Sequence, residues 1–124
     1  MLGIAVLWVN AIVFISYGIA CLLSPELPAG YAGLTISNGD AYVEMGAMYG
    51  GLQTGFGLFI LLCALRPAMR RNGLLLLAMV IGSLALARLY TSYDADWLVG
   101  GYTWGAMAHE FCVAILASVA LKRR

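Results

Sequence analysis

The sequence predicts an all-α integral membrane protein, a bundle of four transmembrane helices that forms one domain over residues 1–124. The first observation is composition, because 63% of the 124 residues are hydrophobic and only 10% are charged. Soluble domains are about 45–50% apolar and about 25% charged. The second is that four stretches reach the ~20 apolar residues that a membrane crossing needs. The third is the segregation of Lys and Arg to alternate connections, which indicates one orientation.

The four predicted spans follow one another along the chain. The first covers residues 2–23 and ends at "SPELP", because proline cannot continue a helix. The second covers residues 41–65 and ends at "RPAMRRNG". The third and fourth cover residues 73–92 and 103–121, and the fourth ends at the basic "KRR".

Charge sorting predicts that both termini lie in the cytoplasm. Six of the seven basic residues lie in the second connection or at the C-terminus: Arg66, Arg70, Arg71, Lys122, Arg123 and Arg124. The other two connections, residues 24–40 and 93–102, contain acidic residues and neither Lys nor Arg. Because cytoplasmic loops carry an excess of Lys and Arg, the four spans form an N-in/C-in protein. The net charge of +1 leaves no basic surface for nucleic acid.

The two outer connections also carry apolar and aromatic side chains. Tyr31 lies in the first, and Trp97 and Tyr102 lie in the second. Tyr and Trp are enriched at membrane interfaces. These connections either fold back over the end of the bundle as short caps or lie in the headgroup layer.

Four ionisable residues lie inside the predicted spans at similar depth. Glu44 is near the outer end of the second span, Arg88 near that of the third, and His109 and Glu110 about two turns inside the fourth. Arg88 is the only strong cation at this depth, and its planar guanidinium can hold a carboxylate through two hydrogen bonds. His109 points about 100° away from Glu110, so Glu44 or Tyr49 is its expected partner.

Three interpretations of this charged cluster remain open. It is a salt bridge that holds helices together, a ligand-binding pocket that opens to the outer side, or a metal site. The absence of HExxH and similar ligand spacings disfavours metal, so no metal and no cofactor is predicted. The cysteines form no CxxC pair and are expected to pack as small apolar residues: Cys21, Cys63 and Cys112.

The second span is rich in glycine, and two small-xxx-small pairs predict close helix packing. Gly46 pairs with Gly50, and Gly51 pairs with Gly55. At helical spacing, Glu44 shares a face with Gly51 and Gly55, so this face is expected to point at protein. The glycines make this span either the central helix of the bundle or an oligomer contact. Polar residues deeper in the spans, Asn10 and Gln53, are expected to bond between helices.

The motif "EMGAMYGGLQTGFG" resembles the pattern E-x-R-A-x-Y-G-G-L-x-x-G of an uncharacterised family of short bacterial four-span membrane proteins, a domain of unknown function. "ARLYTSYDADW" is similar to the family's third span, and Glu110 matches its glutamate in the fourth. Gly46 replaces the family's arginine, which removes one cation, and "YDADW" replaces its usual small turn. The layout is loosely similar to DoxX-like proteins. The resemblance implies a multi-pass protein of the bacterial inner (cytoplasmic) membrane without a known activity.

The favoured function is an accessory or ligand-binding membrane protein whose outer pocket holds a small amphipathic ligand against Arg88. The partners expected are the lipid bilayer, with a membrane-protein partner or a second copy of the chain left open, and no nucleic acid. The alternative is a membrane-embedded enzyme in which His109 or Glu110 acts as acid or base on a lipid-soluble substrate. A proton-relay transporter is disfavoured, because no ionisable residue continues the path inward.

Overall fold

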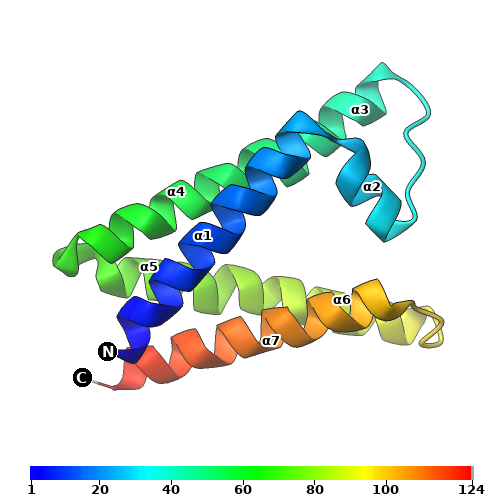
Figure 1. The fold of residues 1–124 in the computed structure, drawn as a ribbon. Helices are drawn as coiled ribbons and strands as arrows, with labels where there is room; N and C mark the ends of the chain where they lie inside the picture. Colours follow the sequence, from blue (N-terminus) through cyan, green and yellow to red (C-terminus); the bar gives the residue numbers. More distant parts are fainter. Residues whose placement is uncertain (124) are drawn as a thin grey trace.

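The computed structural model describes residues 1–123, which form helices and no strand (Figure 1). The elements in chain order are α1 (Leu2–Leu23), α2 (Glu26–Ala32), α3 (Gly39–Met45), the π-helix η1 (Gly46–Gly51), α4 (Leu52–Leu65), the 3₁₀ turn η2 (Pro67–Met69), α5 (Arg70–Leu76), the π-helix η3 (Leu77–Ile81), α6 (Gly82–Asp94) and α7 (Gly101–Lys122). The prediction of an all-helical protein is confirmed.

Within the described residues, four helices are long and apolar enough to cross a membrane: Leu2–Leu23, Gly39–Leu65, Pro67–Asp94 and Gly101–Lys122. The third begins at Pro67 rather than at residue 73, because Pro67 occupies the first helical position, where its missing N–H costs nothing. The expected loop over "RPAMRRNG" is therefore mostly helix, and its three arginines lie on the connection and on the first turns of the third long helix.

The helices pack as two pairs that converge at one end of the molecule. α1 packs along η1 and α4, and α7 packs along η3 and α6. The pairs meet where both termini lie and diverge toward the other end (Figure 1). The main core fills the converging half, where Leu7, Ile60 and Leu77 are fully buried. The candidate functional site lies in the diverging half.

Glycines bring the backbones of α1 and the second long helix into contact. A Cβ added at Gly50 would lie 2.7 Å from the backbone N of Leu22, and one at Gly57 would lie 2.7 Å from that of Ile15. Real Cβ atoms do not approach backbone so closely. The predicted packing role of Gly50 therefore has a geometric basis, and Gly46 is also buried, against Pro25.

The predicted packing of Gly51 and Gly55 against protein is not found within one copy of the chain, and the oligomer contact that the glycines also allow stays a prediction. Both are exposed, and an added Cβ would meet nothing within 4 Å among the described residues. Successive residues point about 100° apart, so Gly50 and Gly51 cannot face the same neighbour. α1 packs against the face of the helix that carries Gly50. The face that carries Gly51, Gly55 and Glu44 therefore points away from the bundle.

The connection between the first two long helices forms a cap over the diverging end. α2 folds back from the end of α1, and the αL residue Gly33 (φ 70°) ends it. The ring of Tyr31 in α2 stacks on that of Tyr102 in α7, with centroids 6.2 Å apart and planes 9° apart. Trp97, in the connection between α6 and α7, stacks instead on Trp104, outside the bundle.

Candidate functional site

An ion pair joins α6 to α7 in the diverging half of the bundle. Nε of Arg88 donates to both carboxylate oxygens of Glu110, at 2.9 and 3.2 Å, and its Nη2 donates to Oε1 at 2.8 Å. The Glu110 side chain is only 7% exposed and that of Arg88 24%. The guanidinium thus satisfies both oxygens of a buried carboxylate, which could not stay charged there without a partner.

Glu44 is not part of this cluster, which corrects the sequence prediction. Its side chain is exposed on the outward face of α3, and no described residue bonds to its carboxylate. Asn38 caps this helix by accepting a hydrogen bond from the N–H of Ala41, so Glu44 lies within two turns of the helix start. The sequence gives the position of Glu44 along its span, but it does not show which way the side of the helix that carries Glu44 faces.

A pocket of about 440 Å³ separates the two helix pairs next to the ion pair. Small-molecule sites in proteins typically occupy about 300–1,000 Å³ and combine an apolar lining with a few polar groups. This pocket has that character, and seven elements contribute to it. Its lining residues are Val13, Phe14, Tyr17, Tyr31, Tyr49, Gln53, Ile81, Leu84, Arg88, Tyr102, Ala106, His109 and Glu110.

Two of the lining groups come from the π-helix η1 and the turn after it. Tyr49 lies within η1, and Gln53 follows four residues later on the same face. π-Helical turns are rare and occur frequently at functional sites. The second π-helix, η3, ends at Ile81, which also lines the pocket.

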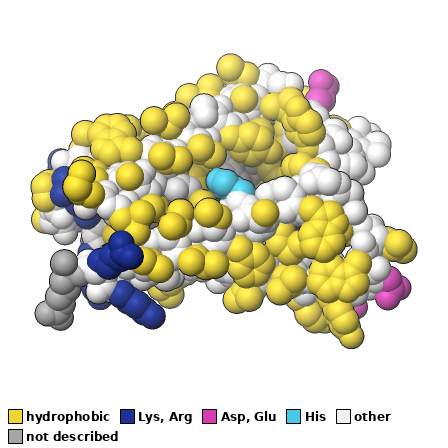
Figure 2. Space-filling model, turned by 60° about the horizontal axis from the view of Figure 1, so that its bottom comes forward, with side chains coloured by type: hydrophobic (Ala, Val, Ile, Leu, Met, Phe, Trp, Pro, Cys, Tyr) yellow, Lys and Arg dark blue, Asp and Glu magenta, His cyan; other side chains and the backbone are white. Residues whose placement is uncertain are grey.

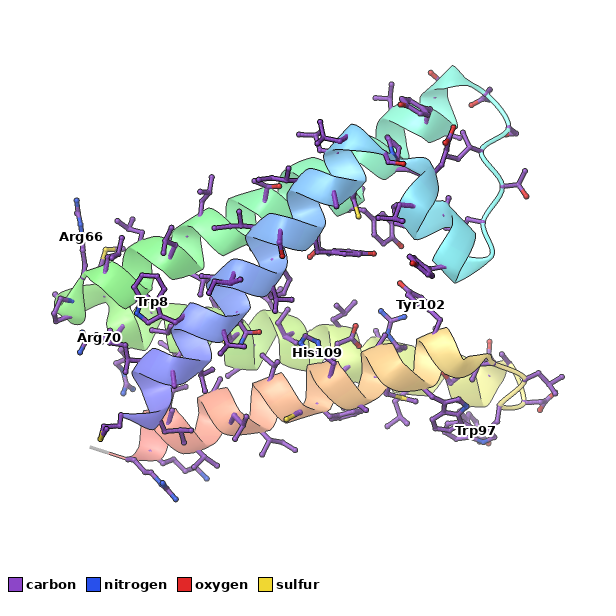
Figure 3. All side chains as sticks on the ribbon, viewed as in Figure 1. Trp8, Arg66, Arg70, Trp97, Tyr102 and His109 are labelled. Atoms are coloured by element: carbon purple, nitrogen blue, oxygen red, sulfur yellow. The ribbon has the colours of Figure 1, made fainter. Side chains whose placement is uncertain are left out.

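His109 lies at the rim of the pocket and is exposed. Figure 2 shows its imidazole at the surface beside a hollow, with apolar side chains around it. Figure 3 shows it between the two helix pairs. The predicted partners, Glu44 and Tyr49, form no hydrogen bond with it among residues 1–123. Its ring nitrogens are therefore available to another molecule.

Sequence reasoning missed four pocket residues that carry a polar group: Tyr17, Gln53, Tyr31 and Tyr102. The available signal was a polar or hydroxyl-bearing side chain within an apolar span, which marks Tyr17 and Gln53. Gln53 was expected to bond between helices, but it faces the pocket instead. Asn10, which carried the same expectation, is buried and donates to the Val6 carbonyl of its own helix at 2.8 Å.

Metal binding finds no support in the described part of the chain. No group of three or more His, Cys, Asp or Glu side chains there could hold a metal ion. The cysteines are free, with Cys21 and Cys63 buried and Cys112 exposed.

The chain belongs to the family described as "Domain of unknown function (DUF4345)", whose model matches residues 4–121. The match covers most of the chain, and it confirms the predicted membership of an uncharacterised family. No curated protein and no solved structure matches the chain.

Proposed function

We propose that the protein crosses the bacterial inner membrane four times, with both termini in the cytoplasm. Basic side chains gather at the end of the bundle where the termini lie, and acidic side chains gather at the other (Figure 2). Arg66 and Arg70 mark the basic end in Figure 3. The positive-inside rule assigns that end to the cytoplasm. The pocket then lies in the outer half of the membrane.

Cysteine labelling tests this topology. In a variant without Cys21, Cys63 and Cys112, a cysteine at Thr35 is expected to react with a membrane-impermeant maleimide added to intact spheroplasts. A cysteine at Arg71 is expected to react only after the membrane is permeabilised. The reverse pattern would contradict the orientation, and reaction of both in intact spheroplasts would contradict the four-span topology.

The pocket supports ligand binding as the function, with a small amphipathic molecule held near Arg88. The observation that carries this proposal is the Arg88–Glu110 pair in the wall of a mostly apolar cavity. A salt bridge that only joins α6 to α7 needs no cavity beside it. Ionisable groups within spans mark functional sites by default, and here they border space that a ligand can fill.

A pair of tryptophan variants tests the binding proposal. Ala106 lines the pocket, whereas Ala108 is exposed on the same helix and does not line it. Native mass spectrometry of the detergent-extracted protein is expected to show a stoichiometric small molecule on the wild type and on Ala108→Trp. Ala106→Trp, which fills the cavity, is expected to lose it. A wild type that carries no small molecule, or equal retention by both variants, would contradict binding in this pocket.

Catalysis is a weaker candidate than binding. Both oxygens of Glu110 accept hydrogen bonds from Arg88, so its carboxylate is not free to act as a base. His109 borders the pocket, but no described carboxylate orients it, as a catalytic histidine usually requires. An accessory role beside a membrane-protein partner, or a second copy of the chain, stays a prediction, as does the similarity of layout to DoxX-like proteins.

A further inference from the structure

We infer that the pocket takes a single-chain lipid with an uncharged, oxygen-bearing headgroup, and that this lipid enters sideways from the membrane between α1 and α7. The inference rests on the proposed function and names its ligand class and its route.

The charges around the pocket favour an uncharged headgroup. The +1 charge of Arg88 and the −1 charge of Glu110 cancel at hydrogen-bond distance. A phosphate or carboxylate drawn to the guanidinium would come close to the carboxylate that already occupies it, and like charges repel strongly where water is scarce.

The hydrogen-bonding groups around the pocket favour oxygen. A guanidinium carries five N–H donors, and the bonds to Glu110 use one on Nε and one on Nη2. The remaining donors of Arg88 are available to a carbonyl or hydroxyl oxygen. Gln53 and the tyrosine hydroxyls of the lining can donate and accept as well. These groups match a headgroup with ester or hydroxyl oxygens.

The shape of the bundle favours entry from the side. The stacked rings of Tyr31 and Tyr102 lie across the outer end, where α2 meets α7. α1 and α7 diverge from the end where the termini lie (Figure 1), and Figure 2 shows a hollow beside His109 in the apolar face of the molecule. Val13 on α1 lines the pocket and is 39% exposed, so the pocket wall is continuous with the lipid-facing surface.

His109 supports the same route. It lies eight residues from the start of α7, about 12 Å along the axis at 1.5 Å per residue. That depth is within the hydrocarbon region of a bilayer about 40–45 Å thick with its headgroups. An exposed imidazole there faces acyl chains that offer no hydrogen bond. A lipid hydroxyl or ester oxygen at the rim of the pocket would supply one.

The volume restricts the ligand to one chain. About 440 Å³ lies in the lower half of the range for small-molecule sites. The pocket can hold a headgroup and the first part of one chain, with the rest of that chain between α1 and α7. A lipid with two acyl chains would have to place both of them in the one opening between α1 and α7.

Two probes with the same chain test the headgroup. They are 1-monooleoylglycerol and its 3-phosphate, titrated onto the delipidated protein and followed by native mass spectrometry. The uncharged lipid is expected to bind one per chain and at least tenfold more tightly than the phosphate. Val13→Trp, which narrows the side opening, is expected to weaken binding at least tenfold. The matched Val9→Trp variant, on an exposed residue of α1 that does not line the pocket, is expected to bind as the wild type does.

A photoreactive diazirine in the oleoyl chain maps the route in vesicles. Adducts on the facing sides of α1 and α7 would support side entry, and adducts confined to α2 would overturn it. Tighter binding of the phosphate would overturn the uncharged headgroup but leave ligand binding intact. If neither probe binds but the purified protein carries another small molecule, the uncharged lipid would be overturned as the ligand while ligand binding itself would stand. Failure of both probes, with no molecule on the purified protein, would overturn the proposed function itself.

Discussion

Arg88→Met alone is expected to destabilise the protein by ~3 kcal/mol, toward the lower end of the ~3–5 kcal/mol typical of breaking a buried ion pair. The substitution leaves the Glu110 carboxylate, 7% exposed, without the partner that donates to both of its oxygens. The partial exposure of Arg88 moderates the effect. Unfolding of the detergent-solubilised protein in increasing denaturant measures the change in free energy.

The control variants make this result specific. Glu44→Gln removes a carboxylate that is exposed and unbonded in the described structure, so we expect a change within about 0.5 kcal/mol. Arg88→Lys keeps the charge but not the planar fork, so it is expected to lie between the wild type and Arg88→Met. If Arg88→Met lowers the free energy of unfolding by less than ~1 kcal/mol, water solvates the ion pair and the prediction is wrong.

The double variant Arg88→Met/Glu110→Gln separates a structural role from a functional one. Removing both charges leaves no uncompensated ion, so much of the lost stability is expected to return. If the ion pair also binds the ligand, the folded double variant is expected to lose its bound small molecule. A double variant that folds and retains that molecule at wild-type occupancy would show that the pair only holds α6 to α7.

The number of long apolar helices could be predicted because the length of an apolar run is a property of a single segment. The orientation that charge segregation indicates stays a prediction. A contact of Arg88 with Glu110 or Glu44 could be predicted, because the three residues lie at a similar depth and Arg88 is the only strong cation there. Which of the two carboxylates Arg88 meets could not be predicted.

Rotation about each helix axis was harder to predict than depth. Glu44 has the right depth, but it lies on the outward face, so it misses the ion pair. Gly50 and Gly51 carry equivalent small-xxx-small signals, and only the position of α1 decides which one is buried. The pocket residues Tyr17 and Tyr102 lie 85 positions apart in sequence, and the packing of two helix pairs brings them to one cavity.

The glycine face of the second long helix provides the other large expected effect. Gly50→Ala and Gly57→Ala are each expected to destabilise the protein by about 1–3 kcal/mol, the usual cost of overpacking. The new methyl group would lie 2.7 Å from the backbone N of Leu22 in the first variant and of Ile15 in the second. Backbone atoms of α1 cannot move aside as a flexible side chain can, so the two helices must separate. Thermal or denaturant unfolding in detergent measures the loss.

Gly51→Ala and Gly55→Ala are the matched controls, since Gly51 shares η1 with Gly50 and Gly55 shares α4 with Gly57. An added Cβ at either control position meets no described atom within 4 Å. Alanine is favoured over glycine in helices by ~1 kcal/mol, so both controls are expected to be neutral or slightly stabilising. All four variants share that helical gain, and the contrast between faces therefore reports packing alone. If Gly51→Ala instead destabilised the protein and reduced its apparent size on gel filtration, the outward face would be a contact between copies of the chain, because no other element of the described bundle reaches it.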